Sequence, residues 1–334
     1  MCEARRPASG SYGLGMRAVT FRDGEVVLDT HPDPEAGSGE VLIRVQAAGL
    51  NGADLLQAKG GYPAPAGSPQ DIPGLELAGE VIASGPGATR FALGDRVTGI
   101  VGGGGQAELI AVHERQISPV ANALTWTQAG GFSEVTITAH DAIVGQAGLR
   151  PGERLLVHGA AGGVGTAAVQ IGRAIGAHVT ASVRNPELRE AVAALGAHDV
   201  IGPEDLENDD AGEPFDVILE LVGAPNMRTN LKRLATGGRI VVIGVGAGFK
   251  AEVNLLALMG KRGALMGSTL RARPLEEKAA ATRAVERELL PLVERGLITV
   301  PVAASFPIED AAAAYERFAA GGKLGKIVLE MPGE

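Results

Sequence analysis

A glycine-rich loop, GAAGGVG, follows the apolar stretch RLLVH and precedes a helical pattern, VGTAAVQIGRAIGA. Gly162 and Gly165 keep the spacing of the second and third glycines of a dinucleotide-binding fingerprint, with Ala160 in place of the first. Such a loop brings the backbone close to a pyrophosphate, and the helix N-terminus offers N–H groups to the phosphates. A purely structural turn is the alternative, but strand, loop, helix and second strand together favour phosphate binding. The loop residues expected to contact the cofactor are Ala161, Gly162, Gly163 and Val164.

The end of the next strand selects the cofactor. The segment ASVRNPE carries Ser182 and Arg184, and its first acid is Glu187, on the following helical stretch. An NAD site usually has an acid at the strand end, which holds the ribose 2′-hydroxyl. An arginine there can pair with a 2′-phosphate that an acid would repel. We therefore expect NADP(H), the alternative being that Arg184 is only a solvated charge.

Later strands of the same pattern should place further residues along the dinucleotide. Ligands of open parallel sheets lie outside the carboxyl ends of the strands, near the point where the strand order reverses. Gly267 and Ser268 follow the sixth strand, and we expect them to meet the nicotinamide carboxamide through backbone groups. The residues that follow the fourth and fifth strands are Val222, Gly223, Gly244 and Val245.

The elements that must position these residues fall into two kinds. With 334 residues, the chain is long enough for two domains. Residues 16–125 read as short strands with irregular loops, whereas strands alternate with helices from about Thr127 onward. Alternation of this kind predicts an α/β fold with a doubly wound parallel sheet. We expect that domain over residues 139–267, inserted between two pieces of a β-rich domain, 16–138 and 268–334, with residues 1–15 as a disordered tail.

Composition limits the possible partners. The net charge is −9, and no Lys/Arg cluster occurs, which argues against nucleic acid or an anionic membrane surface as a partner. The single cysteine, Cys2, excludes a disulfide within the chain and fits a cytoplasmic location. No apolar stretch reaches about 18 residues, so no membrane span is expected. The first fifteen residues lack the apolar region of a secretory signal.

These motifs together resemble a known family. The segment GERLLVHGAAGGVGTAAVQIGR is similar to the signature of the zinc-free quinone oxidoreductase (zeta-crystallin-like) branch of the medium-chain dehydrogenase/reductase superfamily. The segments VLIRVQAAGLNGADLLQAKGGYPAP, IPGLELAGEV, GDRV, GSTLRARP and GKIVL resemble that branch in the expected order, from Met16 to Glu330. VGGGGQAELI and GSTLRAR are most similar to the p53-inducible type. The resemblance implies a GroES-like catalytic domain, a Rossmann domain, NADPH, and a homodimer or homotetramer.

Departures from zinc-dependent relatives exclude their metal sites. Those relatives have a cysteine where this chain has Asn51, and a His-Glu pair where it has Leu75 and Glu76. A four-cysteine structural zinc lobe is impossible with one cysteine. We therefore expect no metal, and hydride delivery to an acceptor that already takes electrons well, a quinone or an activated alkene.

The resemblance also assigns roles to single side chains. Tyr62 lies in the long loop Lys59–Gly74, in a GxYP context in which related enoyl reductases use a tyrosine to hydrogen-bond or protonate the substrate. A phenol can do this while neutral at pH 7, although loop packing is the alternative. Asn51 reads as a helix N-cap with Asp54 three residues on, and by resemblance also faces the nicotinamide or substrate.

Two more residues allow two interpretations each, and a third is assigned one. Thr138 resembles a threonine beside the nicotinamide ring and is otherwise an ordinary helix residue. Lys326, in GKIVL, is either a nicotinamide-end contact or a surface lysine. His158, at the end of the first strand before the glycine loop, is predicted to be a buried structural histidine.

The predicted activity follows from the cofactor and the missing metal. We expect an NADPH-dependent, zinc-independent quinone reductase that acts on a small molecule. The alternative with the same site is reduction of an enone, enal or enoyl thioester at its C=C bond. An alternative of another class is a crystallin-like protein that binds NADPH without turnover.

Overall fold

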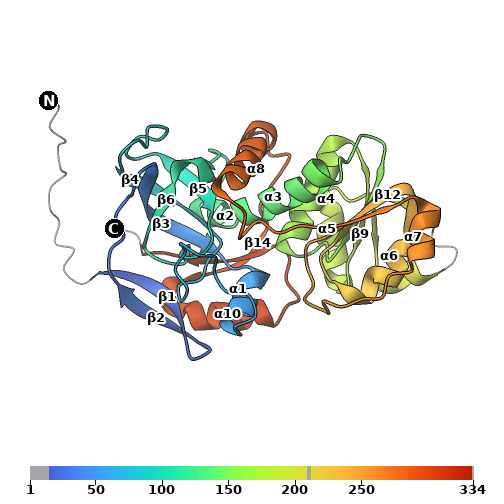
Figure 1. Ribbon diagram of the computed structural model, residues 1–334, viewed down its shortest axis with the longest axis horizontal. Coiled ribbons are helices and arrows are strands. Elements are labelled where there is room, and N and C mark those ends of the chain that lie inside the picture. The colour runs from blue at the N-terminus through green and yellow to red at the C-terminus, as the bar shows by residue number, and fades with distance from the viewer. Residues whose placement is uncertain (1–14, 209–211, 333–334) are drawn as a thin grey trace.

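The computed structural model describes residues 15–208 and 212–332. Each half of the molecule is built on one large sheet, and the two halves lie side by side (Figure 1). The sequence predicted a β-rich domain beside a doubly wound one, and this architecture is confirmed. The predicted disordered tail lies, except for Gly15, outside the described residues.

The β-rich half draws its strands from both ends of the chain. A seven-stranded sheet has the order β14-β15-β3-β4-β5-β7, with β6 also pairing with β3, and β1 and β2 form a separate hairpin. β15 runs antiparallel to β3, so the last strand of the chain lies beside one of the first. The bounds are β1 (Met16–Arg22), β2 (Glu25–His31), β3 (Glu40–Gly49), β4 (Glu76–Ser84), β5 (Arg96–Ile100), β6 (Leu109–His113), β7 (Ile117–Pro119), β14 (Val302–Pro307) and β15 (Lys326–Glu330).

The second half is a six-stranded sheet with the order β10-β9-β8-β11-β12-β13, parallel throughout. Its strands are β8 (Arg154–His158), β9 (His178–Ser182), β10 (Asp199–Ile201), β11 (Phe215–Glu220), β12 (Leu234–Val242) and β13 (Ala264–Gly267). Leu155, Leu156 and Val157 are fully buried, as expected of a central strand covered on both faces. The chain moves outward from β8 in one direction and then returns to β11 on its other side. The strand order therefore reverses between β8 and β11, where a dinucleotide fits.

Helices cover both sheets and join them. Those of the parallel half are α4 (Gly163–Ile175), α5 (Arg189–Ala194), α6 (Met227–Arg233) and α7 (Leu255–Lys261). The others are α1 (Gly52–Ala58), α2 (Trp126–Gly130), α3 (Ser133–His140), α8 (Leu275–Glu288), α9 (Leu290–Glu294) and α10 (Ala311–Ala319). The first crossing between the halves is α3, which continues as a π-helical turn, Asp141–Gln146, and the second leads from β13 to α8. We propose the domain boundaries after Thr138 and after Gly267, the first of which falls inside a continuous helix.

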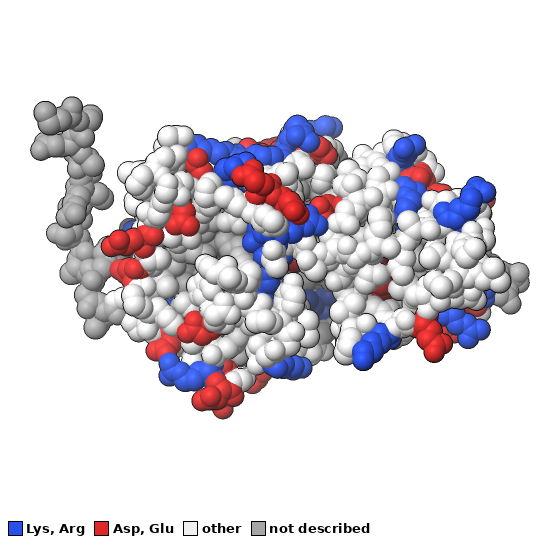
Figure 2. Space-filling view, viewed as in Figure 1, with Lys and Arg blue, Asp and Glu red and all other residues white. Residues whose placement is uncertain are grey.

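The surface carries both signs of charge. On the face in Figure 2, basic and acidic side chains are interspersed, and the surface is hollowed where the two halves meet. None of the helices within residues 15–208 and 212–332 is long and apolar enough to span a membrane.

Candidate active site

The glycine-rich loop has the geometry of a phosphate cradle. Helix α4 begins at Gly163 with Gly162 as its N-cap, and no side chain caps it, so its first N–H groups are available to a ligand. A Cβ on Gly165 would lie 2.4 Å from the Gly159 carbonyl oxygen, which explains why only glycine fits where helix and strand pack together. A Cβ on Gly162 would meet only that same oxygen, at 3.4 Å, so the loop is open in front of it. These residues fit a dinucleotide pyrophosphate.

The same loop is fastened to the β-rich half. The Gly325 N–H donates to the Ala161 carbonyl at 2.8 Å, and Gly162 forms a β-bridge with Gly325. A Cβ on Gly163 would lie 2.7 Å from Cγ1 of Val135 and 2.9 Å from Cδ of Lys326. The loop therefore lies directly against the start of α3 and against Lys326.

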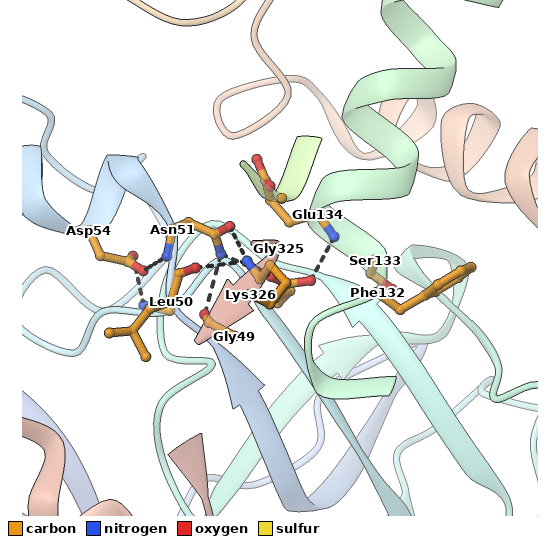
Figure 3. A network of polar contacts seen from close by, with 12 residues as sticks. Gly49, Leu50, Asn51, Asp54, Phe132, Ser133, Glu134, Gly325 and Lys326 are labelled. Carbon is orange, nitrogen blue, oxygen red and sulfur yellow. Dashed lines mark hydrogen bonds and ion pairs between the residues drawn. The ribbon is translucent and has the colours of Figure 1, made fainter. Parts of the chain in front are cut away.

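Lys326 is the centre of a buried polar network. Its side chain is 3% exposed, so the surface-lysine interpretation is wrong. Nζ lies 2.6 Å from Oε1 of Glu76 and donates to Oδ1 of Asn51 at 2.6 Å and to the Leu50 carbonyl at 2.7 Å. The Asn51 amide donates in turn to Glu76 at 3.1 Å. Figure 3 shows Asn51 and Lys326 pointing toward each other, so the Asn51 side chain is committed to this network although the residue also begins α1.

Glu134, which the sequence analysis did not single out, adjoins this network. Its N–H donates to Oε2 of Glu76 at 2.9 Å, so a fully buried carboxylate caps the start of α3. Its own carboxylate accepts from the Thr138 hydroxyl at 3.3 Å. Burial and the neighbouring Glu76 raise the pKa of Glu134 to about 7, against the opposing effect of the Lys326 ammonium. The sequence signal was weak, since an acid in a first helical turn is usually only a dipole partner.

Asp54 completes the acidic side of the network. Its carboxylate accepts from the Asn51 N–H at 2.8 Å, the capping contact expected from the sequence, and from the Gln106 side chain at 3.3 Å. The side chain is 1% exposed, and burial raises its pKa to about 6.

Tyr62 is held in place by Arg271. The Arg271 guanidinium donates to the Tyr62 carbonyl at 2.8 Å, and its central carbon lies 5.1 Å from the ring centroid. It also donates to Gln57, on α1, at 2.5 Å. Partial burial raises the pKa of Tyr62, with a further contribution from the Glu134 carboxylate, so the phenol stays neutral at pH 7. Arg271 lies in GSTLRARP, far along the chain, and was not among the residues predicted to act in the site.

The end of β9 is more exposed to solvent than the Lys326 network. Ser182 is buried, whereas Arg184 is exposed. Arg189, which the sequence analysis passed over, donates from Nε to the Val183 carbonyl at 3.2 Å and lies 3.4 Å from Glu204. Two arginines therefore lie within seven residues of the end of β9.

The Glu220 side chain holds the loop that follows β11. This fully buried carboxylate accepts from the N–H groups of Val222 at 2.7 Å and Gly223 at 2.8 Å. Asn230 donates to Glu220 at 2.7 Å and contacts Nε2 of His158 at 2.7 Å. His158 is 2% exposed, which confirms the prediction of a buried structural histidine.

Close backbone contacts explain two glycines of the loops after β11 and β12. Gly223 has φ +119°, and a Cβ on Gly244 would lie 2.3 Å from the Leu221 carbonyl oxygen. Val245, beside them, is exposed.

Ser268 fastens the two crossings to each other. Its N–H donates to the Val242 carbonyl at 3.1 Å, so that predicted backbone donor is already engaged. Its hydroxyl lies 3.1 Å from Asp141 and 2.8 Å from Arg273, which themselves form a two-bond ion pair at 2.9 and 2.7 Å. Gly267, just before it, ends β13, and a Cβ added to it would meet no atom within 4 Å. Ser268 is thus part of the junction between the halves.

The described residues hold no group of three or more His, Cys, Asp or Glu side chains that could bind a metal ion. Leu75 and Glu76 stand at the positions of the His-Glu ligand pair discussed above, and Glu76 contacts the Lys326 ammonium.

Comparison with known proteins identifies the family. Residues 37–147 match the alcohol dehydrogenase GroES-like domain family, and residues 163–287 match the family described as zinc-binding dehydrogenase. Quinone oxidoreductase of Rattus norvegicus is 32% identical over 94% of this chain and 97% of its own length, and that of Homo sapiens is 32% identical over the same shares. Polyketide synthase GfsB of Streptomyces halstedii is 34% identical over 88% of this chain, which corresponds to 5% of that protein.

Solved structures agree on the fold. The crystal structure of AibC is 28% identical in sequence and superposes with a TM-score of 0.84, over 99% of this chain and 100% of that chain. An alcohol dehydrogenase superfamily protein from Novosphingobium aromaticivorans, 29% identical, gives 0.84 over 95% of this chain and 100% of that one. With its open glycine loop, its reversing sheet and these relatives, the chain belongs to the quinone oxidoreductase family of the medium-chain dehydrogenase/reductases and is an oxidoreductase that uses a nicotinamide cofactor.

Proposed function

We propose that this protein is an NADPH-dependent, zinc-independent quinone reductase. The observation that carries the proposal is the buried network of Lys326, Glu76 and Asn51 against the glycine loop. Asn51 and Glu76 stand at positions where the sequence comparison expects metal ligands in zinc-dependent relatives, and in this chain both contact the Lys326 ammonium. A second cation beside that ammonium would be repelled. Without a Lewis acid the protein suits acceptors that need no polarising metal, and a quinone is such an acceptor.

The cofactor would supply a hydride. The chain would bind the cofactor with backbone groups and a few side chains. The proposed contacts are Ala161, Gly162, Gly163 and Val164 at the pyrophosphate, Ser182 and Arg184 at the adenosine, Val222, Gly223, Gly244 and Val245 along the strand ends, and Thr138, Gly267, Ser268 and Lys326 toward the nicotinamide. Lys326 would influence the nicotinamide end of the site indirectly, because its ammonium already contacts the side chains of Glu76 and Asn51. Tyr62 is the proposed hydrogen-bond donor to the acceptor, and Asn51 positions Lys326.

We further propose a homodimer, formed by the open edge of the parallel sheet. β13 is the edge strand, and its Leu265 is partly exposed. Helix α7 lies at the same end of the molecule, far from the β-rich half (Figure 1). The exposed apolar residues there are Phe249, Leu255, Leu256 and Met259. A second copy would pair β13 with β13 and cover these side chains. Leu256→Asp should shift the sedimentation of the protein to that of a monomer.

Two alternative functions are tested in the same experiment as the quinone reductase. The similarity to polyketide synthases supports an alkene reductase with the same site, acting on an enone, enal or enoyl thioester. A non-catalytic NADPH-binding protein is the third candidate. The cytoplasmic location stays a prediction from the single cysteine.

A turnover screen separates these functions. Purified protein is mixed with NADPH and, in turn, quinones, enals and crotonyl-CoA, and NADPH oxidation is followed by absorbance. We expect the highest kcat/KM with a quinone, before and after chelator treatment, and substoichiometric zinc by elemental analysis. Faster reduction of an alkene would favour the second function, and NADPH binding without any turnover the third. One zinc per chain together with loss of activity on chelation would contradict the proposal.

A further inference from the structure

Glu134 lies at the start of α3, between the buried Lys326 network and the glycine loop in the chain's contacts: its N–H donates to Glu76, and its neighbour faces Gly163. Its neighbour Val135 contacts the glycine loop, because Gly163 has no side chain between them. On its other side Glu134 is close enough to Tyr62 to affect the charge state of the phenol. Figure 3 shows the Glu134 carboxyl pointing away from Lys326 and Asn51, and the residue is only partly buried. Glu134 thus belongs to the segment that adjoins the glycine loop, and its carboxyl, bonded to Thr138, is near enough to Tyr62 to raise the pKa of the phenol.

The charges around Glu134 favour a bound proton. The carboxyl groups that face this region are Glu76 from β4, Asp54 from α1 and Glu134 from α3, and the cations are Lys326 from β15 and Arg271. Lys326 contacts Glu76 and Asn51, and Arg271 is bonded to Gln57, Gly102 and Tyr62. Glu134 has no cation of its own, and the partner found for its carboxylate among the described residues is the Thr138 hydroxyl at 3.3 Å. Burial without a paired cation stabilises the neutral acid.

We propose that Glu134 is the proton donor of the reaction and that Tyr62 holds the acceptor by a hydrogen bond. This inference rests on the proposed function. The acceptor gains two electrons and one hydrogen as hydride from the reduced nicotinamide. The O–H bond of the Glu134 carboxyl breaks, and its proton goes to the reduced oxygen of a quinone or to the α-carbon of an enone. The Glu134 carboxylate regains a proton from water, so each turnover consumes one proton from solution.

The division of labour between Glu134 and Tyr62 follows from their acidities. A general acid works best when its pKa lies near the working pH. The pKa of Glu134 is about 7, whereas that of Tyr62 is raised above its usual value. Tyr62 can therefore donate a hydrogen bond and keep its proton, while Glu134 exchanges its proton at neutral pH. The rate should fall as the pH rises through about 7, because the carboxyl then loses the proton it must deliver.

The decisive variant is Glu134→Gln. The glutamine amide can keep a hydrogen bond to Thr138 and leaves the N–H to Glu76 intact, but it holds no titrating proton. With an enone, kcat/KM should fall on the order of 10²–10⁴-fold, and the decline above about pH 7 should vanish. With a quinone the loss should be smaller, because quinol oxygens also take protons from water. The NADPH dissociation constant should stay unchanged. Glu316→Gln, an exposed change on α10, is the matched control.

A second measurement needs neither cofactor nor turnover. Infrared difference spectra of the free protein, recorded against pH, should contain a protonated-carboxyl band that disappears with a midpoint near 7 and is absent in Glu134→Gln. Glu134→Asp keeps the proton but withdraws it by one methylene, so its rate should fall while the pH dependence remains. If Glu134→Gln does not fold, Glu134→Asp and the parent spectrum decide.

The outcomes separate this inference from the proposed function. If the parent reduces no acceptor, the proposed function is wrong, and the infrared titration still tests the proton on Glu134. If the parent is active but Glu134→Gln keeps its rate and pH profile, Glu134 is not the donor. Absence of the carboxyl band would also overturn the proposal.

Discussion

The two ends of the interdomain site are built in opposite ways. At one end Asn51, Glu76 and Lys326 come from separate segments of the chain and bind one another almost out of contact with water, and the partly buried Glu134 is bonded to them through its N–H. At the other end Ser182, Arg184 and Arg189 follow one another after β9, and both arginines reach solvent. The first end, the network end, is stabilised by the fold and contributes to it. The second, the β9 end, depends little on distant contacts. Substitutions at the network end should therefore alter stability and chemistry together, whereas those at the β9 end should alter binding alone.

Removal of the central cation should have the largest effect. Lys326→Met leaves the Glu76 carboxylate buried without its ion-pair partner. Breaking a buried pair on one side costs about 3–5 kcal/mol, so the apparent free energy of unfolding in urea should fall by about that much. Arg184→Ala, at the β9 end, should change it by no more than about 0.5 kcal/mol. Partial recovery in Lys326→Met with Glu76→Gln would identify the stranded charge as the cause. Equal losses of unfolding free energy in Lys326→Met and Arg184→Ala would mean that the two ends contribute equally to stability.

Tyr62→Phe should affect chemistry and leave the β9 end untouched. The variant removes a donor to the oxygen on which charge develops but keeps the ring beside Arg271. Loss of one such donor typically costs about 10²–10³-fold in rate. We expect a loss at the lower end of this range with an enone, a smaller one with a quinone, and an unchanged NADPH dissociation constant. A Tyr62→Phe enzyme with unchanged kcat/KM for every accepted substrate would reduce the residue to loop packing.

Arg184→Ala should change cofactor choice without a change in chemistry. The parent should bind NADPH at least about tenfold tighter than NADH, which corresponds to about 1.4 kcal/mol. Fluorescence titration of the variant should show most of that preference gone and NADH affinity retained. Arg189→Ala, tested beside it, reports how far the second arginine shares the 2′-phosphate. Equal affinities for the two cofactors in the parent would refute the assignment of NADPH.

The pH dependence of stability should also differ between the two ends. Folding raises the pKa of Asp54 from 3.8 to about 6 and that of Glu134 from 4.5 to about 7. The folded state thus binds these protons more tightly than the unfolded state, and their contribution to stability decreases as the pH rises from about 4 to about 7. The melting temperature of Glu134→Gln should fall less steeply over this range than that of the parent. Parallel curves would mean that Glu134 is ionised throughout.

The same contrast explains what could be predicted from the sequence. The fold and the glycine loop were predictable because alternating elements and a turn of consecutive residues are local signals. Lys326 was ambiguous, since a lysine that opens an apolar strand is buried only if a carboxylate from elsewhere meets it. Glu134, Arg271 and Glu220 were missed for the same reason, as each gains its role from partners distant in the sequence. Arg189 was missed because a charged residue on a helix near the surface is usually only solvated.

The cluster of Asp141, Ser268 and Arg273 has a mechanical consequence. Its hydrogen bonds join the π-helical turn of the first crossing to the start of the second crossing. The two segments that connect the halves are therefore held together at one place. Two bodies whose connecting segments are held together in this way can turn about that place as a hinge. Atoms near the hinge then travel little, while those far from it sweep the longest arcs. Any opening about this hinge that admits a long ligand would also have to break the Gly325–Ala161 hydrogen bond at the glycine loop, while the groups nearest the hinge keep their alignment.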